Sequence, residues 1–361
     1  MTTTADRPTE QIDEAKLEQF VFTVVGEIGA TLNTAEVVMG VRLGLYTAMA
    51  GAGWLTPAEL ARRTGVHERY VREWLNGQAA GSYVEYEPAD GTYRLPPEQA
   101  AALADPDSPA YVAGFFQIAL GTVLDTHKVI DTARAGTGFG WHEHGEDVFE
   151  GCESFFRTGY KANLVASWLP ALDGVVEKLE AGARVADIGC GHGASTILMA
   201  QAYPNSTFIG TDYHEGSIAT ARKRAAEAGV GDRVRFETSL AVASPGEQFD
   251  LVTTFDCLHD MGDPVGAARH VHDILTPDGT WMIVEPMAGD RVEDNLNPVG
   301  RAYYGFSTFL CTPAGLSQQP ALALGAQAGQ QRIQDVVTSA GLTRFRRATE
   351  TPFNLIYEAR R

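Results

Sequence analysis

The sequence predicts an α/β protein, a doubly wound, Rossmann-like parallel sheet preceded by an all-helical and winged-helix region. Two observations carry this prediction. Apolar, β-branched runs alternate with stretches of helical spacing from residue 183 onward. A glycine-rich turn, Gly189 to Gly193, joins the first of these runs to a helix. The length of 361 residues favours about two domains. We expect a helical and winged-helix dimerisation domain at 1–105, a helical bridge at 106–182 and the sheet domain at 183–361.

The N-terminal part is expected to be helical and then winged. After a polar segment at residues 1–10, expected to be disordered, helical spacing indicates helices at 17–28 and 34–50. Thr56-Pro57 begins a helix-turn-helix. Two short alternating runs around Asp90-Gly91 complete a winged helix.

Charge argues against nucleic acid as a partner of this winged helix. Between residues 54 and 100, five arginines face seven carboxylates: Arg62, Arg63, Arg69, Arg72 and Arg94 against Glu59, Glu68, Glu73, Glu85, Glu87, Asp90 and Glu98. A DNA reader presents an excess of positive charge instead. The formal net charge of −18 also disfavours an anionic membrane. Because the apolar helices before residue 50 need a surface to cover them, we expect a homodimer through this domain.

Cysteine usage and hydropathy indicate the compartment. The four cysteines lie far apart and form no CxxC pair, which is untypical of a disulfide scaffold or a thiolate zinc site. The N-terminus has no signal-like apolar core, and no apolar run is expected to reach membrane-spanning length. These features predict a cytoplasmic protein.

The bridge is helical and rich in aromatic residues, which are expected to pack in the core or to roof a ligand cleft. They are Tyr111, Phe115, Phe116, Trp141, Phe149, Phe155, Phe156 and Tyr160. The run His142-Glu143-His144 resembles a pair of metal ligands but lacks further ligands at suitable spacing. We therefore expect no metal, although three aspartates, Asp256, Asp260 and Asp263, could imitate a magnesium site.

The second half alternates strands and helices, as a doubly wound sheet requires. Five strands are expected at 184–188, 207–212, 234–237, 249–255 and 279–285. The helices between them are expected at 194–203, 217–228 and 264–275. A helix at 332–340 then precedes an antiparallel hairpin formed by 344–349 and 354–358.

The glycine turn favours an adenosyl compound over a dinucleotide. Its spacing is GxGxG, and Asp187 stands just before it. A carboxylate there would repel a pyrophosphate but suits the cationic methionyl group of S-adenosylmethionine. Asp212 ends the second strand, where an acidic residue accepts hydrogen bonds from ribose hydroxyls. The alternative is an NAD or FAD site, which needs glycines spaced for a pyrophosphate.

Four motifs resemble the class I S-adenosylmethionine-dependent methyltransferases: VADIGCGHG, IGTD, FDCLHDMGDP and ILTPDGTWMIVEP. With the winged helix, the whole chain is similar to small-molecule O-methyltransferases and to related actinobacterial methyltransferases. The resemblance implies a cofactor site around the following residues: Asp187, Gly189, Cys190, Gly191 and Gly193 for the methionyl part, Asp212 for the ribose, Tyr213 beside the adenine, Thr238, Ser239 and Leu240 for the adenine amino group, and Phe255 and Asp256 facing the sulfonium. The family often has aspartate after the third strand, and this chain does not.

His259 is the residue expected to act as general base. It follows the fourth strand at the carboxyl edge of the sheet, where open α/β folds bind ligands. An imidazole titrating near neutrality suits removal of a hydroxyl proton, and the resemblance places a base at this position. Glu285, at the end of the fifth strand, is expected to orient it in preference to the adjacent Asp260. Asp263 is expected to cap a helix.

The sequence therefore predicts an S-adenosylmethionine-dependent methyltransferase acting on a hydroxyl of a small, aromatic or apolar molecule. A segment at 286–330 is expected to form the acceptor pocket or to pack on the first domain, through Asn295, Asn297, Arg301, Tyr303, Tyr304, Phe306, Phe309 and Leu310. The alternatives are N- or C-methylation, a reaction that uses the sulfonium only electrostatically, and a winged-helix regulator that senses S-adenosylmethionine.

Overall fold

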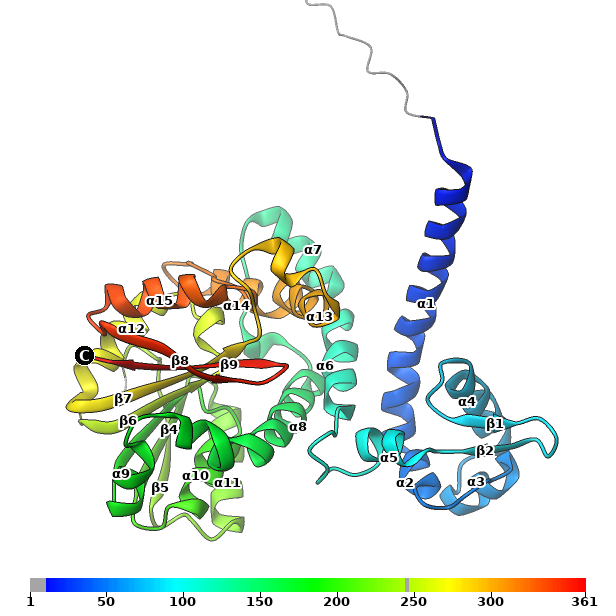
Figure 1. Ribbon diagram of the computed structural model, residues 1–361, viewed down its shortest axis with the longest axis horizontal. Helices are drawn as coiled ribbons and strands as arrows, with labels where there is room; N and C mark the ends of the chain where they lie inside the picture. The colour runs from blue at the N-terminus through cyan, green and yellow to red at the C-terminus, as the bar shows by residue number, and fades with distance from the viewer. Residues whose placement is uncertain (1–10, 244–246) are drawn as a thin grey trace, which may run out of the picture. The chain divides into compact units, whose positions relative to one another are not determined.

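The computed structural model describes residues 11–243 and 247–361. The expected disorder of residues 1–10 lies outside the described residues. The chain divides into two compact units, residues 1–105 and 106–361. Figure 1 shows both units, which are taken one at a time below. The division into three parts, with a separate bridge, stays a prediction.

The first unit begins with one long helix. α1 (Glu14–Arg42) is continuous, so the expected break between residues 28 and 34 is wrong. Gly29 lies inside the helix with open space around it, and the chain breaks at Gly44, whose φ of 66° starts α2 (Leu45–Met49). Among the described residues, α1 is the one helix whose length and composition would allow it to cross a membrane, which corrects the expectation that no segment reaches that length.

A winged helix follows α1 and α2. α3 (Pro57–Thr64) begins with a capping box between Thr56 and Glu59, and α4 (Glu68–Ala80) packs on it. β1 (Glu85–Glu87) and β2 (Thr92–Arg94) form an antiparallel pair, and α5 (Pro97–Leu103) follows. Apolar side chains of α3 and α4, including Leu60 and Trp74, are fully buried and form the centre of this unit.

The second unit contains a seven-stranded sheet of order β5-β4-β3-β6-β7-β9-β8. Its strands are β3 (Arg184–Ile188), β4 (Thr207–Asp212), β5 (Val234–Thr238), β6 (Phe249–Phe255), β7 (Leu275–Pro286), β8 (Arg344–Glu350) and β9 (Asn354–Arg360). β3 to β7 pair in parallel with one another, and β9 pairs antiparallel with both β7 and β8. The predicted fold class and the predicted terminal hairpin are confirmed.

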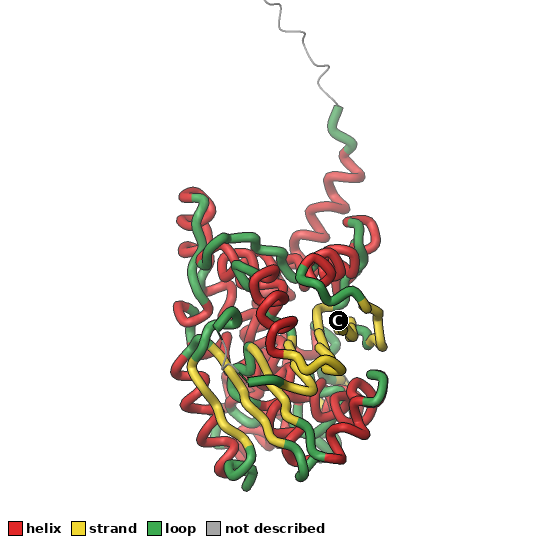
Figure 2. Tube along the Cα trace, turned by 90° about the vertical axis from the view of Figure 1, so that its left-hand side faces the viewer, coloured by secondary structure: helices red, strands yellow, loops and turns green. Residues whose placement is uncertain are grey.

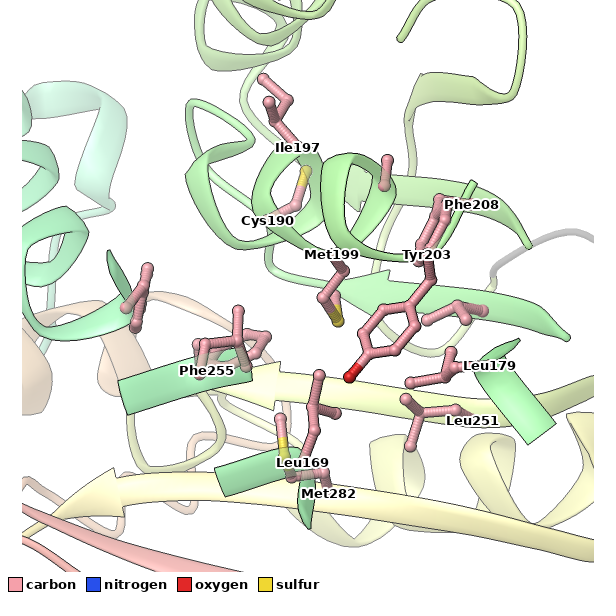
Figure 3. Close-up of a cluster of buried hydrophobic side chains, with 14 of the residues drawn as sticks. Leu169, Leu179, Cys190, Ile197, Met199, Tyr203, Phe208, Leu251, Phe255 and Met282 are labelled. Carbon is pink, nitrogen blue, oxygen red and sulfur yellow. The ribbon is translucent and has the colours of Figure 1, made fainter. Parts of the chain in front are cut away.

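Helices cover both faces of this sheet (Figure 1). On one face, α9 (Val175–Ala181), α10 (Ala194–Ala202) and α11 (Glu215–Glu227) bury apolar side chains against the strands. On the other face, α12 (Pro264–Ile274) and α15 (Gly329–Ser339) do the same. Figure 2 shows the strands running side by side between helices. Figure 3 shows the first core, where Met199, Tyr203 and Phe208 meet Leu251 and Met282. Each such side chain contributes about 1.5–3 kcal/mol on burial.

A further helical layer belongs to this unit. It contains α6 (Ala113–Leu124), α7 (Thr126–Ala135), α8 (Glu146–Asn163), α13 (Pro298–Phe306), the π-helical turn η6 (Ser307–Cys311) and α14 (Thr312–Ser317), with short turns η1 (Trp141–Glu143), η2 (Leu164–Trp168), η3 (Leu169–Ala171), η4 (Leu258–Asp260) and η5 (Val292–Asn295) between elements. α6 and α8 approach closely at Gly114 and Gly151, which have no side chain. A Cβ on Gly114 would lie 2.7 Å from the backbone of α8, and one on Gly151 would lie 2.6 Å from the backbone of α6. α8 thereby reaches the sheet edge that carries the functional side chains.

Candidate active site

A cavity opens at the carboxyl ends of β3, β4, β5 and β6, on both sides of the point where the strand order reverses. Ten residues of the expected site line it: Gly189, Cys190, Gly191, Asp212, Tyr213, Ser239, Leu240, Phe255, Asp256 and Asp260. Five others do not line it: Asp187, Gly193, Thr238, His259 and Glu285. These five lie directly behind the lining residues or adjoin them in sequence.

The glycine loop gives the cavity a floor made of backbone. Gly189, Gly191 and Gly193 all have positive φ, which L side chains rarely adopt. A Cβ on Gly189 would lie 2.7 Å from the Cys257 sulfur, and one on Gly193 would lie 2.6 Å from the Phe236 ring. A Cβ on Gly191 would meet open space. The first and third glycines are thus required by packing, whereas the middle one faces room for a ligand.

Asp187 is buried behind this loop. Its carboxylate accepts hydrogen bonds from Ser195 Oγ at 2.7 Å, Thr196 Oγ1 at 2.6 Å and Thr253 Oγ1 at 3.0 Å. Burial raises the pKa of Asp187 to about 6, although the three hydroxyls oppose this shift. These contacts tie the start of α10 to β3 and β6. The geometry therefore favours a positioning role over the expected contact with a methionyl ammonium group.

Asp212 joins the loop to the second strand. One carboxylate oxygen accepts from the Gly191 N–H at 3.0 Å, and the other accepts from the His214 N–H at 2.9 Å. Burial raises the pKa of Asp212. Because each oxygen has a second lone pair, the carboxylate can still accept from a ligand hydroxyl. Next to it, the Tyr213 hydroxyl accepts from the Trp141 N–H at 2.9 Å, which joins η1 to this side of the cavity.

His259 and Glu285 form a buried pair beside the cavity. His259 Nδ1 lies 2.8 Å from Glu285 Oε2, and each residue is only 3% exposed. Glu285 Oε1 also accepts from the Leu258 N–H at 3.2 Å, so the carboxylate is held in place. Asp260 makes a different contact, since it accepts from Trp141 Nε1 at 2.7 Å. The structure thus brings the histidine to the glutamate and joins the adjacent aspartate to η1.

The surroundings of His259 determine its charge. Burial lowers the pKa of His259, but the carboxylate of Glu285 outweighs this effect and raises the pKa well above its usual value. The pair with Glu285 thus favours the protonated form of the ring. Its other nitrogen, Nε2, lies 3.3 Å from the sulfur of Cys311 in η6. A hydroxyl that gives its proton to Nε2 must take the place of this thiol.

Asp256 has an unusual backbone and an unsatisfied oxygen. Its φ is 50°, in the left-handed region, and its N–H donates to the Val284 carbonyl at 2.8 Å. Oδ1 accepts from Asn354 Nδ2 at 2.8 Å, while Oδ2 is buried and has no partner among the described residues. Burial and the nearby Glu285 raise the pKa of Asp256 well above its usual value. A buried oxygen of this kind is costly unless a ligand satisfies it.

The cavity wall includes residues beyond the predicted cofactor-binding and catalytic set. Phe149 on α8 stacks on His214 at 5.0 Å and on His192 at 6.4 Å between ring centroids. Glu153, also on α8, pairs with Arg157 at 3.0 Å and Arg224 at 2.7 Å. The lining residues that the sequence did not single out also include Cys152, Ala194, Ser195, Ser217, Ala241, Cys257, Met261 and Gln318. Their signal in the sequence is helical spacing on α8 and proximity to the motifs.

The aromatic residues of 106–182 divide between the two expected roles. Trp141, Phe149, Phe156 and Tyr160 line the cavity. Phe115 instead packs on Phe155 at 4.6 Å and on Phe306 at 5.1 Å between centroids.

The segment 286–330 mainly packs against other parts of the second unit. The Tyr303 hydroxyl donates to the Phe353 carbonyl at 3.0 Å, and Leu310 is buried with Ile118 and Val148. Asn295, Asn297, Arg301 and Tyr304 line a second, separate hollow. Of this segment, Gln318 is the one described residue that lines the main cavity.

The remaining polar candidates have structural partners. His144 Nδ1 lies 2.7 Å from Asp125 Oδ2. Asp263 accepts from the Gly266 N–H at 2.8 Å and caps α12, as the sequence predicts. Within residues 11–243 and 247–361, no group of three or more histidine, cysteine, aspartate or glutamate side chains is arranged to hold a metal ion.

The charge of the cavity wall fits a cation. Four carboxyl groups line it, on Glu153, Asp212, Asp256 and Asp260, and no lysine or arginine is among the described lining residues. A pyrophosphate would meet repulsion here, whereas a sulfonium or ammonium group would be attracted. The residues present therefore fit an adenosyl sulfonium compound better than a dinucleotide.

Two family models match the chain. The Rv2258c-like winged HTH domain matches residues 32–105, and a methyltransferase domain matches residues 179–340. The ubiquinone biosynthesis O-methyltransferase of Ruegeria pomeroyi is 37% identical over 103 residues, which are 28% of this chain and 41% of that protein. The chain spans about half or less of the length of the curated relatives it matches.

Solved structures share the fold over nearly the whole chain. An O-methyltransferase family protein from Burkholderia thailandensis has a TM-score of 0.69 and 18% identity, covering 94% of this chain and 98% of its own. Human N-acetylserotonin methyltransferase, solved with SAM, has a TM-score of 0.69 and 16% identity, covering 98% and 99%. At these identities the likeness shows the fold.

Proposed function

From the premise that this chain joins a winged helix-turn-helix domain to a methyltransferase domain of the S-adenosylmethionine-dependent class I fold, we propose that it methylates a hydroxyl of a small molecule. The observation that carries the proposal is the buried His259–Glu285 pair beside a cavity that fits a cationic adenosyl compound. Aromatic side chains line that cavity, which supports an aromatic or apolar acceptor.

The methyl donor would be held mainly by the β3, β4 and β5 side of the cavity. The glycine loop would receive the methionyl part, Asp212 the ribose, and Tyr213, Ser239 and Leu240 the adenine. When bound, S-adenosylmethionine supplies a methyl group that its sulfonium has already activated. The chain then has two tasks, which are to align an acceptor oxygen and to remove its proton.

His259 would perform the second task. Glu285 holds Nδ1, so Nε2, which lies beside Cys311 of η6, is the nitrogen that would take the proton. Because Glu285 raises the pKa of His259, the neutral ring that can accept a proton forms only as the pH rises through that raised value. Low exposure of both residues excludes water from the pair, which strengthens their interaction.

Oxygen as the acceptor atom is supported by the buried base and by the names of curated relatives and of a structural neighbour that are O-methyltransferases. An amine acceptor is the alternative, because a neutral amine needs little help in losing its proton after attack. The two differ in how strongly turnover depends on His259.

The first test is calorimetric titration with S-adenosylmethionine, S-adenosylhomocysteine and NAD, followed by transfer of labelled methyl to hydroxylated and amine acceptors. We expect the two adenosyl compounds to bind and NAD not to bind. His259→Gln should then lower turnover of a hydroxyl acceptor by about 10²–10⁴-fold while S-adenosylhomocysteine affinity stays within threefold. His272→Gln, at a half-buried position of α12 that does not line the cavity, is the matched control. Near-normal turnover by His259→Gln would exclude His259 as the general base and favour an amine or carbon acceptor.

We also propose a homodimer formed through α1. Apolar side chains recur on α1 at intervals of three and four and are exposed: Leu17, Phe20, Val21, Val24, Val25, Ile28 and Leu32. A stripe of this kind suits pairing with an identical helix. Sedimentation equilibrium should give twice the monomer mass, and Val21→Glu with Val25→Glu should give the monomer. Flotation of the wild-type protein with lipid vesicles, together with a monomeric mass, would instead favour a membrane role for α1.

The winged helix is proposed to be structural, in a cytoplasmic enzyme. On α4, Arg69 pairs with Glu73 at 2.5 Å and Arg72 pairs with Glu68 at 2.5 Å, so both arginines are neutralised. Phosphates would meet little free positive charge there. We expect no retardation of genomic DNA fragments even at low salt, and salt-sensitive retardation would support a regulator instead.

A further inference from the structure

We propose that the methyl acceptor carries no negative charge and donates a second hydrogen bond, from a hydroxyl or an amine, to Asp256. The proposal deepens the function proposed above and rests on it. It concerns which small molecules the cavity takes, and it follows from where Asp256 lies, what holds it and which charges surround it.

Asp256 lies on the acceptor side of the cavity. The adenosyl side is built at the ends of β3, β4 and β5, by the glycine loop, Asp212 and Ser239. Asp256 follows β6, on the other side of the strand-order reversal and three residues before His259. Its own partner, Asn354, begins β9, next to the Phe353 carbonyl that accepts from Tyr303 of α13. These elements come from outside the glycine-loop half of the sheet.

The two oxygens of Asp256 have different surroundings. Oδ1 is held by the amide of Asn354, and the backbone N–H is held by β7, so the side chain is fixed in direction. Oδ2 is buried and has no donor among the described residues. A fixed, buried acceptor atom without a donor is complementary to a ligand that brings an O–H or N–H.

The charges around this end of the cavity reject anions. Asp256 and Asp260 accept from an amide and an indole, both neutral, at 2.8 and 2.7 Å. Glu153, in contrast, is paired with Arg157 and Arg224. Burial raises the pKa of both carboxyl groups, so this end of the cavity already disfavours negative charge. A carboxylate or phosphate on the acceptor would add a further negative charge there, whereas a neutral or cationic acceptor would not.

The test uses the full-length protein loaded with S-adenosylhomocysteine and three small probes: catechol, 2-aminophenol and salicylate. The first two carry a second donor beside a phenolic hydroxyl, whereas salicylate carries a carboxylate there. Ligand-detected NMR should show binding of catechol and 2-aminophenol, with salicylate at least tenfold weaker. Asp256→Asn should weaken catechol about tenfold and narrow its advantage over salicylate. Asp273→Asn, on the exposed end of α12, is the matched control.

Calorimetry of the same variants decides whether Asp256 contacts the methyl acceptor or S-adenosylmethionine. We expect Asp256→Asn to bind S-adenosylmethionine and S-adenosylhomocysteine within threefold of wild type. A loss of tenfold or more would assign Asp256 to the methionyl ammonium group and overturn the proposal. So would equal binding of salicylate and catechol by wild type, or no binding of any probe.

Methyl transfer separates this inference from the function on which it rests. If hydroxyl acceptors are methylated without the preference for neutral, donor-bearing molecules, only the role of Asp256 fails. If the probes bind in the expected order but no hydroxyl acceptor of any kind is methylated, the proposed O-methylation fails.

Discussion

The two halves of the sheet edge are built in different ways. At the ends of β3, β4 and β5, the cavity wall is backbone and local contacts: glycines with positive φ, and Asp212 bonded to Gly191 and His214. At and beyond the ends of β6 and β7, the site contains buried ionisable side chains whose partners come from distant segments: Asn354 contacts Asp256 in the cavity wall, and Cys311 contacts His259 behind it. The first half can be a general receptor for a common ligand, whereas the second depends on an individual packing arrangement.

The largest effect is expected in the half at the ends of β3, β4 and β5, the adenosyl half, where replacing the loop glycines should weaken binding of the adenosyl compound. The half at and beyond β6 and β7 is the acceptor half. Gly193→Ala places a Cβ 2.6 Å from the Phe236 ring at a φ of 78°, so the loop must move, and we expect S-adenosylhomocysteine affinity to fall by about a hundredfold or more. Gly191→Ala has room for its Cβ and should lose only about tenfold, from backbone strain of roughly 1–2 kcal/mol. Calorimetric Kd values measure both. Equal losses would show that packing does not distinguish the two glycines.

The acceptor half should respond to pH instead. Glu285→Gln removes the carboxylate that raises the pKa of His259, so the neutral base forms at lower pH. We expect the rising limb of the kcat/KM profile to move to lower pH, and the plateau to fall by roughly 10–100-fold because the orienting charge is lost. S-adenosylhomocysteine affinity should not change. A profile that keeps its wild-type position would separate the pH dependence from the His259–Glu285 pair.

Sequence reasoning succeeded where contacts are local. The glycine loop, β4 with Asp212 and the cap at Asp263 are each encoded within a few residues, so period and turn chemistry predict them. It failed for the break in α1, because Gly29 lies inside a helix that tolerates it and Gly44 ends the segment instead.

Partners that lie far apart in sequence could not be found this way. The contact of Trp141 with Asp260 joins residues 119 apart, and that of Asn354 with Asp256 joins residues 98 apart. No periodicity encodes such a pair, because tertiary packing alone brings it together. Both pairs lie in the acceptor half of the site. The sequence motifs therefore located this half, but they did not predict which distant residues complete it.

The stability of the protein should depend on the ionisation of Asp260, at the end of β6. Burial raises the pKa of Asp260 to about 6, so the folded state resists its ionisation. The protein therefore loses up to about 3 kcal/mol as the pH rises from the unfolded value near 4 to the folded value near 6. Asp260→Asn can still accept from Trp141 Nε1 and should be more stable than wild type at pH 8, with little difference at pH 4. Chemical denaturation at both pH values measures this, with Asp273→Asn as the exposed control; an equal effect at both would contradict it.

The smallest expected effect concerns the thiol that faces the base. Cys311 is buried among Ile118, Val148 and Leu310, and its sulfur lies 3.3 Å from His259 Nε2, the nitrogen that the proposed acceptor hydroxyl would approach. Cys311→Ala leaves room there and should raise kcat/KM for a hydroxyl acceptor by up to about threefold, while the lost packing lowers stability by about 1 kcal/mol. Cys311→Leu fills the same space and should lower kcat/KM without changing S-adenosylhomocysteine affinity. If both variants change the affinity for S-adenosylhomocysteine and leave acceptor kinetics unchanged, η6 belongs to the adenosyl half, and the sheet edge is not divided between β3–β5 and β6–β7 in this way.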